Sequence, residues 1–90
     1  MTYRLNILKN ANTDLDWLRR HDRTSYTKCF DLVREVMETP RSGSGKPERL
    51  KYFSKKEVWS RRVNRKDRMV YTIYEAIQEI DISSFRGHYS

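Results

Sequence analysis

The sequence predicts an α+β fold in which a two-helix hairpin packs on one face of a mainly antiparallel sheet of about five strands. Helical periodicities are confined to the first half of the chain, short β-type runs fill the second half, and one strand-like segment precedes the helices. The length of 90 residues suits a single domain, spanning residues 1–90, and leaves no room for a second hydrophobic core.

The first predicted strand, residues 3–8, alternates apolar and polar side chains with a period of two. Asn12 or Thr13 then offers an N-cap for a first helix of about 10 residues. Leu15 and Leu18 lie on its predicted apolar face. The helix is expected to end near His21.

A second helical pattern follows, with apolar side chains recurring at steps of three and four residues. These are Tyr26, Cys29, Phe30, Leu32, Val33, Val36 and Met37. Pro40 and the glycine-serine run 42–45 end the pattern. Because Cys29 lies within this stripe, we interpret it as a buried apolar side chain rather than a nucleophile or ligand.

Four further strands are predicted from runs of β-branched and aromatic residues at 50–53, 58–63, 68–74 and 78–86. In the third run, Met69, Tyr71 and Ile73 alternate with the other positions. One face of this strand is therefore expected to pack on the helices and the other to stay polar.

The net charge of +7 is concentrated in one segment. Residues 40–70 hold eleven of the nineteen basic residues and three of the twelve acidic ones, a local net charge of +8. Such a segment suits a polyanion, because each neutralised phosphate releases counterions. A solvated face that keeps the protein soluble and a surface for an acidic protein are the alternative interpretations.

Several classes of function are disfavoured by the residues present. The positions of His21, His88 and Cys29 do not resemble a zinc site, and no carboxylates cluster as in a magnesium site, so neither a metal nor a cofactor is expected. No stretch approaches the roughly 20 apolar residues of a membrane span. The start of the chain lacks the apolar run of a signal peptide. A cytoplasmic protein without a membrane partner is therefore predicted.

The groups that remain are those of a metal-free ribonuclease. RNA can attack itself through its 2′-hydroxyl when a base, an acid and positive charge surround the phosphate. Glu48, His88 and several arginines could supply them. The alternatives are a surface ion pair for Glu48, a frayed terminal residue for His88, and structural salt bridges from the arginines to Glu57 or Asp67.

Four motifs follow one another along the second half of the chain. They are Gly43-Ser-Gly45-Lys46-Pro47-Glu48-Arg49-Leu50-Lys51, Trp59-Ser60-Arg61-Arg62-Val63, Asp67-Arg68-Met69-Val70-Tyr71 and His88-Tyr89. In order and spacing they resemble the YoeB/Txe family of toxins, within the RelE/ParE-like superfamily. The motifs cover residues 40–89, and residues 1–39 match only in general pattern. Ser90 extends the chain one residue beyond the family's usual ending.

The resemblance implies a toxin of a type II toxin-antitoxin system, an endoribonuclease that cleaves messenger RNA in the ribosomal A site. It implies Glu48 as general base, Arg68 as the arginine that stabilises the phosphate, His88 as general acid and Tyr89 as the aromatic that orients the substrate. Which of Glu48 and His88 is base and which is acid stays open.

The implied partners are messenger RNA, the ribosome with its ribosomal RNA, and an antitoxin of the YefM/Axe (Phd-like) class; a homodimer is left open. The residues predicted to bind RNA or the ribosome are Lys46, Lys51, Arg61, Arg62 and Arg65.

Two rival functions remain at this point. One is a non-enzymatic ParE-like inhibitor of DNA gyrase, which would lack a convergent Glu, Arg and His set. The other is a basic module that binds RNA or the ribosome without cleaving, with Tyr52, Phe53 and Trp59 stacking on bases.

Overall fold

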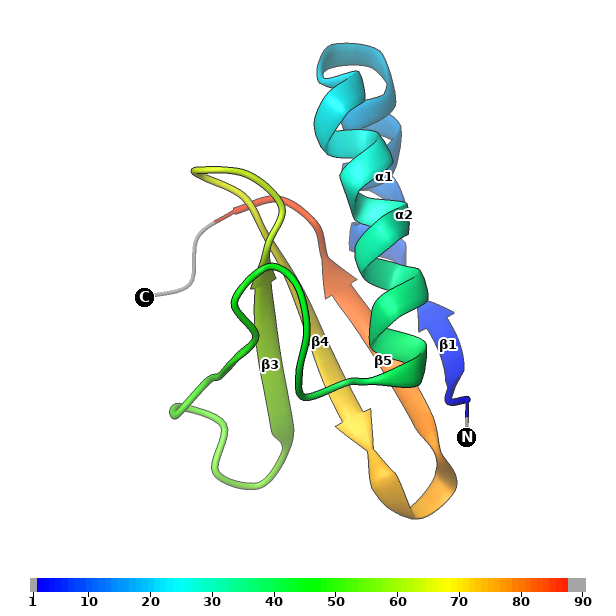
Figure 1. Cartoon of the computed structure of the whole chain (residues 1–90), viewed down its shortest axis with the longest axis vertical. Helices are drawn as coiled ribbons and strands as arrows, with labels where there is room; N and C mark the ends of the chain where they lie inside the picture. The colour runs from blue at the N-terminus through cyan, green and yellow to red at the C-terminus, as the bar shows by residue number, and fades with distance from the viewer. Residues whose placement is uncertain (1, 88–90) are drawn as a thin grey trace.

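The computed structural model describes residues 2–87, which form two helices packed against a five-stranded sheet (Figure 1). The elements in chain order are β1 (Arg4–Ile7), α1 (Lys9–His21), α2 (Arg23–Glu38), β2 (Glu48–Arg49), β3 (Glu57–Arg62), β4 (Arg68–Tyr74), the short 3-10 helix η1 (Glu75–Ile77) and β5 (Glu79–Ser84). The predicted α+β fold class is confirmed.

The strands lie in the order β1-β5-β4-β3-β2. The first and last strands of the chain, β1 and β5, are parallel neighbours, and all other neighbouring pairs are antiparallel. The helical hairpin lies between β1 and the meander in sequence, and α1 packs on β5. Residues from both ends of the chain therefore meet in the sheet, in agreement with the mainly antiparallel prediction.

The two helices begin differently from one another. Asp22 caps α2, since its carboxylate accepts hydrogen bonds from the Ser25 amide at 3.2 Å and the Ser25 hydroxyl at 2.7 Å. The predicted N-cap of α1 at Asn12 or Thr13 is wrong. The helix starts at Lys9, directly after β1, without a side-chain cap, and both residues lie inside it.

The main core lies between the helices and the sheet. Its fully buried members include Ala11, Leu18, Cys29, Leu32, Val36, Met69, Tyr71, Ile80, Ile82 and Phe85. The prediction that Cys29 is a buried apolar side chain is confirmed, and burial raises the pKa of its thiol to about 12. The predicted stripe of α2 is right in outline, although Phe30 is exposed.

A second, smaller core cluster unites Leu50, Val58 and Val70. Two predictions fail here. β4 is buried on both faces, with Val70 3% and Thr72 7% exposed, rather than polar on one face. The predicted strand 50–53 is largely a turn: the Leu50 amide still donates a 2.8 Å hydrogen bond to the Val58 carbonyl, and the chain turns at Lys51 and Tyr52.

None of the helices within residues 2–87 is long and apolar enough to cross a membrane. In the same part of the chain, no three His, Cys, Asp or Glu side chains gather in a way that could hold a metal ion.

Candidate nucleic-acid site

The strand register brings three of the predicted site residues onto one face of the sheet. Glu48 pairs with Ser60, and Arg62 pairs with Arg68. Directly paired residues point to the same face, as do residues two apart in a strand. Glu48, Arg62 and Arg68 therefore share the face turned away from the helices. Val58, Ser60, Val70 and Thr72 of the same face are buried, so we use the name open face only for the part formed by the three charged residues.

The three charged groups of the open face are available to a ligand. Glu48 and Arg62 are exposed and Arg68 is partly buried. Among residues 2–87, no side-chain hydrogen bond or ion pair engages any of them. The alternative interpretation of Glu48 as half of a surface ion pair thus has no partner in the described chain.

The described end of the chain is tied to Arg68. The Arg68 amide donates a 3.2 Å hydrogen bond to the carbonyl of Gly87, and the Gly87 amide donates a 3.2 Å bond to Asp67 Oδ1. The predicted catalytic residues His88 and Tyr89 lie outside the described residues. The backbone that precedes them nevertheless reaches the open-face arginine that the sequence predicted as their partner.

Helix α1 holds the same terminal segment from its other side. Asp14 Oδ2 accepts hydrogen bonds from the amides of Phe85 at 3.0 Å and Arg86 at 3.2 Å. The Arg86 guanidinium lies 3.5 Å from the centre of the Trp17 ring, a cation–π contact. Sequence reasoning missed Asp14 and Trp17, because nothing in the helical pattern indicates that they meet residues more than 60 positions away.

Arg61 corrects the sequence prediction. It was expected to bind RNA or the ribosome, but its side chain is 0% exposed. Its terminal nitrogens donate to the carbonyls of Thr39 at 2.6 Å, Ser42 at 2.8 Å and Ser44 at 3.3 Å, and to Glu35 Oε1 at 3.0 Å. The guanidinium therefore anchors the segment that leads from α2 to Glu48 and has no face left for a phosphate.

The end of that segment is fixed by main-chain geometry at Gly45. The Arg62 amide donates a 2.6 Å hydrogen bond to the Gly45 carbonyl. Gly45 has a φ of +81°, and a Cβ there would lie 3.0 Å from the Arg62 carbonyl oxygen. This close approach holds Lys46, which is exposed, just before Glu48.

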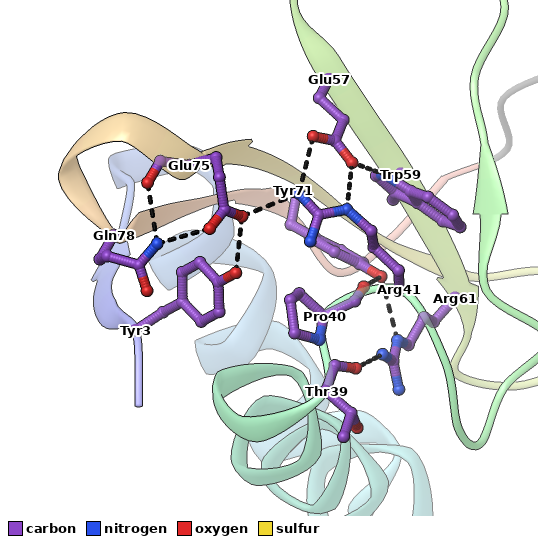
Figure 2. A network of polar contacts seen from close by, with 10 residues as sticks. All are labelled: Tyr3, Thr39, Pro40, Arg41, Glu57, Trp59, Arg61, Tyr71, Glu75 and Gln78. Atoms are coloured by element: carbon purple, nitrogen blue, oxygen red, sulfur yellow. Dashed lines mark hydrogen bonds and ion pairs between the residues drawn. The ribbon is translucent and has the colours of Figure 1, made fainter. Parts of the chain in front are cut away.

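A second anchor involves Arg41, which belongs to the basic segment by sequence but is neutralised in the structure (Figure 2). It forms two hydrogen bonds with Glu57, at 2.6 and 2.9 Å, and one of 2.9 Å with Glu75. Its charge lowers the pKa of Glu57. Glu75 also accepts from the Tyr3 hydroxyl at 2.7 Å, and these bonds, with Tyr3 foremost, lower its pKa to about 2. Glu57 thus serves Arg41 rather than the site arginines.

The other basic residues of 40–70 have no side-chain partner among residues 2–87. They are Lys46, Arg49, Lys51, Lys55, Lys56, Arg62, Arg65, Lys66 and Arg68. The predicted RNA-binding cations Lys46, Lys51, Arg62 and Arg65 are all exposed. With Arg41 and Arg61 removed, the positive surface is carried by β2, the end of β3 and the two turns beside them.

The two helices, the five-stranded sheet and the exposed basic residues define a class of protein that comparison with solved structures identifies as small toxins of the YoeB/ParE kind. The fold is similar to that of a solved YoeB/ParE toxin from Agrobacterium tumefaciens, with a TM-score of 0.85 and 32% identity, over 96% of this chain and 99% of that one. It is also similar to YoeB of Staphylococcus aureus, solved as a dimer (TM-score 0.81, 28% identity, 99% of this chain and 100% of that one) and in a YoeB–YefM complex (TM-score 0.77, 26% identity, with the same coverage).

Sequence comparison narrows the class. Residues 8–89 match the family described as YoeB-like toxin of bacterial type II toxin-antitoxin system. Toxin YoeB of Synechocystis sp. is 37% identical over 87 residues, covering 91% of this chain and 98% of that protein. The chain belongs to the YoeB-like family of type II toxins.

Proposed function

We propose that this toxin is a ribosome-dependent endoribonuclease that acts in the cytoplasm and cleaves messenger RNA in the ribosomal A site. The observation that supports the proposal best is the convergence of Glu48, Arg62 and Arg68 on the open face, with the backbone of Gly87 bonded to Arg68. A carboxylate beside arginines that have no side-chain partner among residues 2–87 supplies two of the groups that RNA self-cleavage needs, a base and positive charge around the phosphate.

In the proposed reaction, Glu48 takes the proton of the 2′-hydroxyl as the 2′-oxygen bonds to phosphorus. The bond from phosphorus to the 5′-oxygen breaks, and His88 supplies the proton that this oxygen needs to leave. Arg68 balances the charge on the phosphate, with Arg62 beside it, and Tyr89 orients the nucleotide. The product ends in a 2′,3′-cyclic phosphate. The pH–rate profiles of Glu48→Gln and His88→Gln decide which group is the base.

In this proposal, the exposed cations Lys46, Lys51 and Arg65 bind RNA or the ribosome. They flank the open face rather than line it, so they suit phosphates on either side of the cut. Each phosphate they neutralise contributes to a salt-dependent affinity.

We further propose an antitoxin of the YefM/Axe (Phd-like) class as the protein partner. The support is the complex of the similar S. aureus YoeB with YefM and the unpaired cations of 40–70, which an acidic, folding-on-binding segment could neutralise. A homodimer is proposed on the same footing, because S. aureus YoeB was solved as a dimer.

The test is primer extension on a defined messenger in a reconstituted translation reaction, with and without ribosomes, comparing the native chain with His88→Ala. Cuts that require both ribosomes and His88 support the proposal. If the folded native chain makes no cuts but blocks DNA supercoiling by gyrase, the ParE-like alternative replaces it. Tight ribosome binding without cuts or gyrase inhibition would favour the simple binding module.

A further inference from the structure

The turn between β2 and β3, residues 50–56, forms an exposed tip that the proposed reaction does not use. Tyr52 is 82% exposed, the highest value among the large hydrophobic side chains described, and Phe53 is 39% exposed. Residues 52–56 line an open hollow. A tyrosine ring left this far in solvent contributes nothing to the core, so its apolar faces are free to stack on a partner.

The tip is also positively charged. Lys51 precedes Tyr52 in the chain, and Lys55 and Lys56 line the same hollow as Tyr52. All three are exposed and form no ion pair within residues 2–87. The acidic residue next in the chain, Glu57, is already bonded to Arg41 and to the Trp59 indole. No neighbouring carboxylate of the tip therefore balances these lysines.

An exposed aromatic ring among unpaired lysines fits single-stranded nucleic acid better than a protein helix. An unpaired base stacks on the ring while the flanking phosphates meet the ammonium groups. Trp59, the other aromatic of this region, is partly buried against the core, with its Nε1 donating to Glu57 at 2.9 Å. Tyr52 is therefore the most exposed stacking surface of this region, and Phe53 beside it is 39% exposed.

The tip and the open-face arginines lie at opposite ends of β3. The tip precedes Glu57, the first residue of the strand, and Arg62 is its last. In Figure 1 the turn that precedes β3 lies at the other end of this strand from the turn to β4. At about 3.3 Å per residue, β3 separates the tip from Arg62 by about 17 Å. Single-stranded RNA with its bases stacked at about 3.4 Å per nucleotide covers that distance with about five nucleotides.

We propose that the tip is a second RNA contact, in which Tyr52 stacks on an unpaired base and Lys51, Lys55 and Lys56 bind the phosphates beside it. It holds RNA about five nucleotides from the phosphate at Arg68. The inference takes its class of ligand, RNA, from the proposed function. It is tested by binding alone, so that the result for the tip does not depend on whether the protein cleaves RNA.

The experiment measures fluorescence anisotropy of labelled single-stranded RNAs of three and nine nucleotides with the full chain. Tyr52→Ala should weaken binding of the nine-nucleotide RNA by about fivefold or more, and Tyr52→Trp should retain it, because stacking needs only a π-face. Ile77→Ala is the matched control, since Ile77 is 63% exposed outside the basic segment, and should change affinity less than twofold.

Two further readouts separate stacking and charge. The native chain should gain affinity from three to nine nucleotides, and Tyr52→Ala should lose most of that gain. The double variant Lys55→Gln/Lys56→Gln should reduce the slope of log affinity against log salt by about 1.4, or 0.7 per phosphate contact.

Each pattern of results has one meaning. If Tyr52→Ala keeps the native affinity for RNA and the lysine variant keeps the native salt slope, the tip is not an RNA contact, whether or not the native chain cleaves messenger RNA on ribosomes. If RNA binding depends on Tyr52 but the native chain does not cleave messenger RNA on ribosomes, the RNA contact at the tip is supported and the nuclease proposal is wrong. If Tyr52→Ala loses affinity for an acidic peptide and none for RNA, the tip is a protein contact and the inference is wrong.

Discussion

Arg61 and Tyr71 form a buried pair beneath the segment that leads to Glu48. Arg61 Nε donates a 3.0 Å hydrogen bond to the Tyr71 hydroxyl, which donates a 2.7 Å bond to the carbonyl of Pro40, as Figure 2 shows. Both side chains are 0% exposed. Because these bonds end on the chain that follows α2, the pair holds the segment that leads to Glu48 from inside the core.

Arg61→Met should destabilise the protein by about 3–5 kcal/mol, because it leaves buried carbonyls and the partly buried Glu35 without their donor. Urea unfolding followed by circular dichroism measures the change. A loss below about 1 kcal/mol would mean that water satisfies the same acceptors and that Arg61 is no anchor.

The adjacent Arg62→Met is the matched comparison. Arg62 is exposed and has no side-chain partner among residues 2–87, so its replacement should change stability by less than about 0.5 kcal/mol. As a charge of the open face it should lower the rate of ribosomal cleavage by about tenfold or more. If both variants unfold alike, the division between an interior and an open-face arginine is wrong.

Tyr3→Phe should raise the pKa of Glu75 from about 2 toward the ordinary value, because the hydroxyl is the first of the hydrogen bonds that lower it. NMR titration of the Glu75 carboxyl measures this directly. A depressed folded-state pKa stabilises the native state above about pH 4.5, and that contribution is lost as pH falls toward 2. The variant should therefore lose less stability than the native chain over this interval. An unchanged Glu75 pKa would assign the shift to the hydrogen bonds from Arg41 and Gln78.

Gly45→Ala should destabilise the protein by about 1–2 kcal/mol, since a Cβ meets the Arg62 backbone at a φ of +81°. The strain falls next to Lys46 and Glu48, so cleavage should slow more than the stability loss explains. The measurement pairs urea unfolding with single-turnover cleavage at saturating toxin. Native rates in a destabilised variant would show that the bond from Arg62 to Gly45 does not position Glu48.

Cys29 should resist thiol reagents in the native protein, because burial raises its pKa to about 12. Labelling with a chromogenic disulfide should occur only as urea unfolds the chain, with the same midpoint as the loss of helix signal. Rapid labelling without urea would show that the α2 side of the core opens locally.

Elements with a clear periodicity could be predicted from the sequence, and β4 matches its predicted bounds. The errors occur where tertiary contacts override local preference. α1 starts at Lys9 rather than at the polar residues Asn12 and Thr13, because the chain enters the helix straight from β1. Residues 50–53 have β propensity, yet the bonding of β2 to β3 ends with the Leu50 amide, 2.8 Å from the Val58 carbonyl, and the chain turns at Lys51 and Tyr52.

The site was predictable as a set of residue types and less so as a geometry. Arg61 and Arg62 are adjacent arginines in one motif. The alternation of side chains along β3 places Arg61 in the interior and Arg62 on the open face. Arg41 carries the same charge, but Glu57 and Glu75, 16 and 34 residues away, neutralise it. Such assignments depend on register and distant partners, which composition and spacing do not encode.

The central claim, that the open face cleaves RNA, is tested most directly by single-turnover cleavage on programmed ribosomes with Glu48→Gln. The control is Asp31→Asn, which removes an exposed carboxylate of α2 that forms an ion pair with Arg34. We expect Glu48→Gln to slow cleavage at least about 100-fold with native stability and ribosome affinity, and Asp31→Asn to cleave at the native rate. Cleavage by Glu48→Gln within twofold of the native rate would contradict the account.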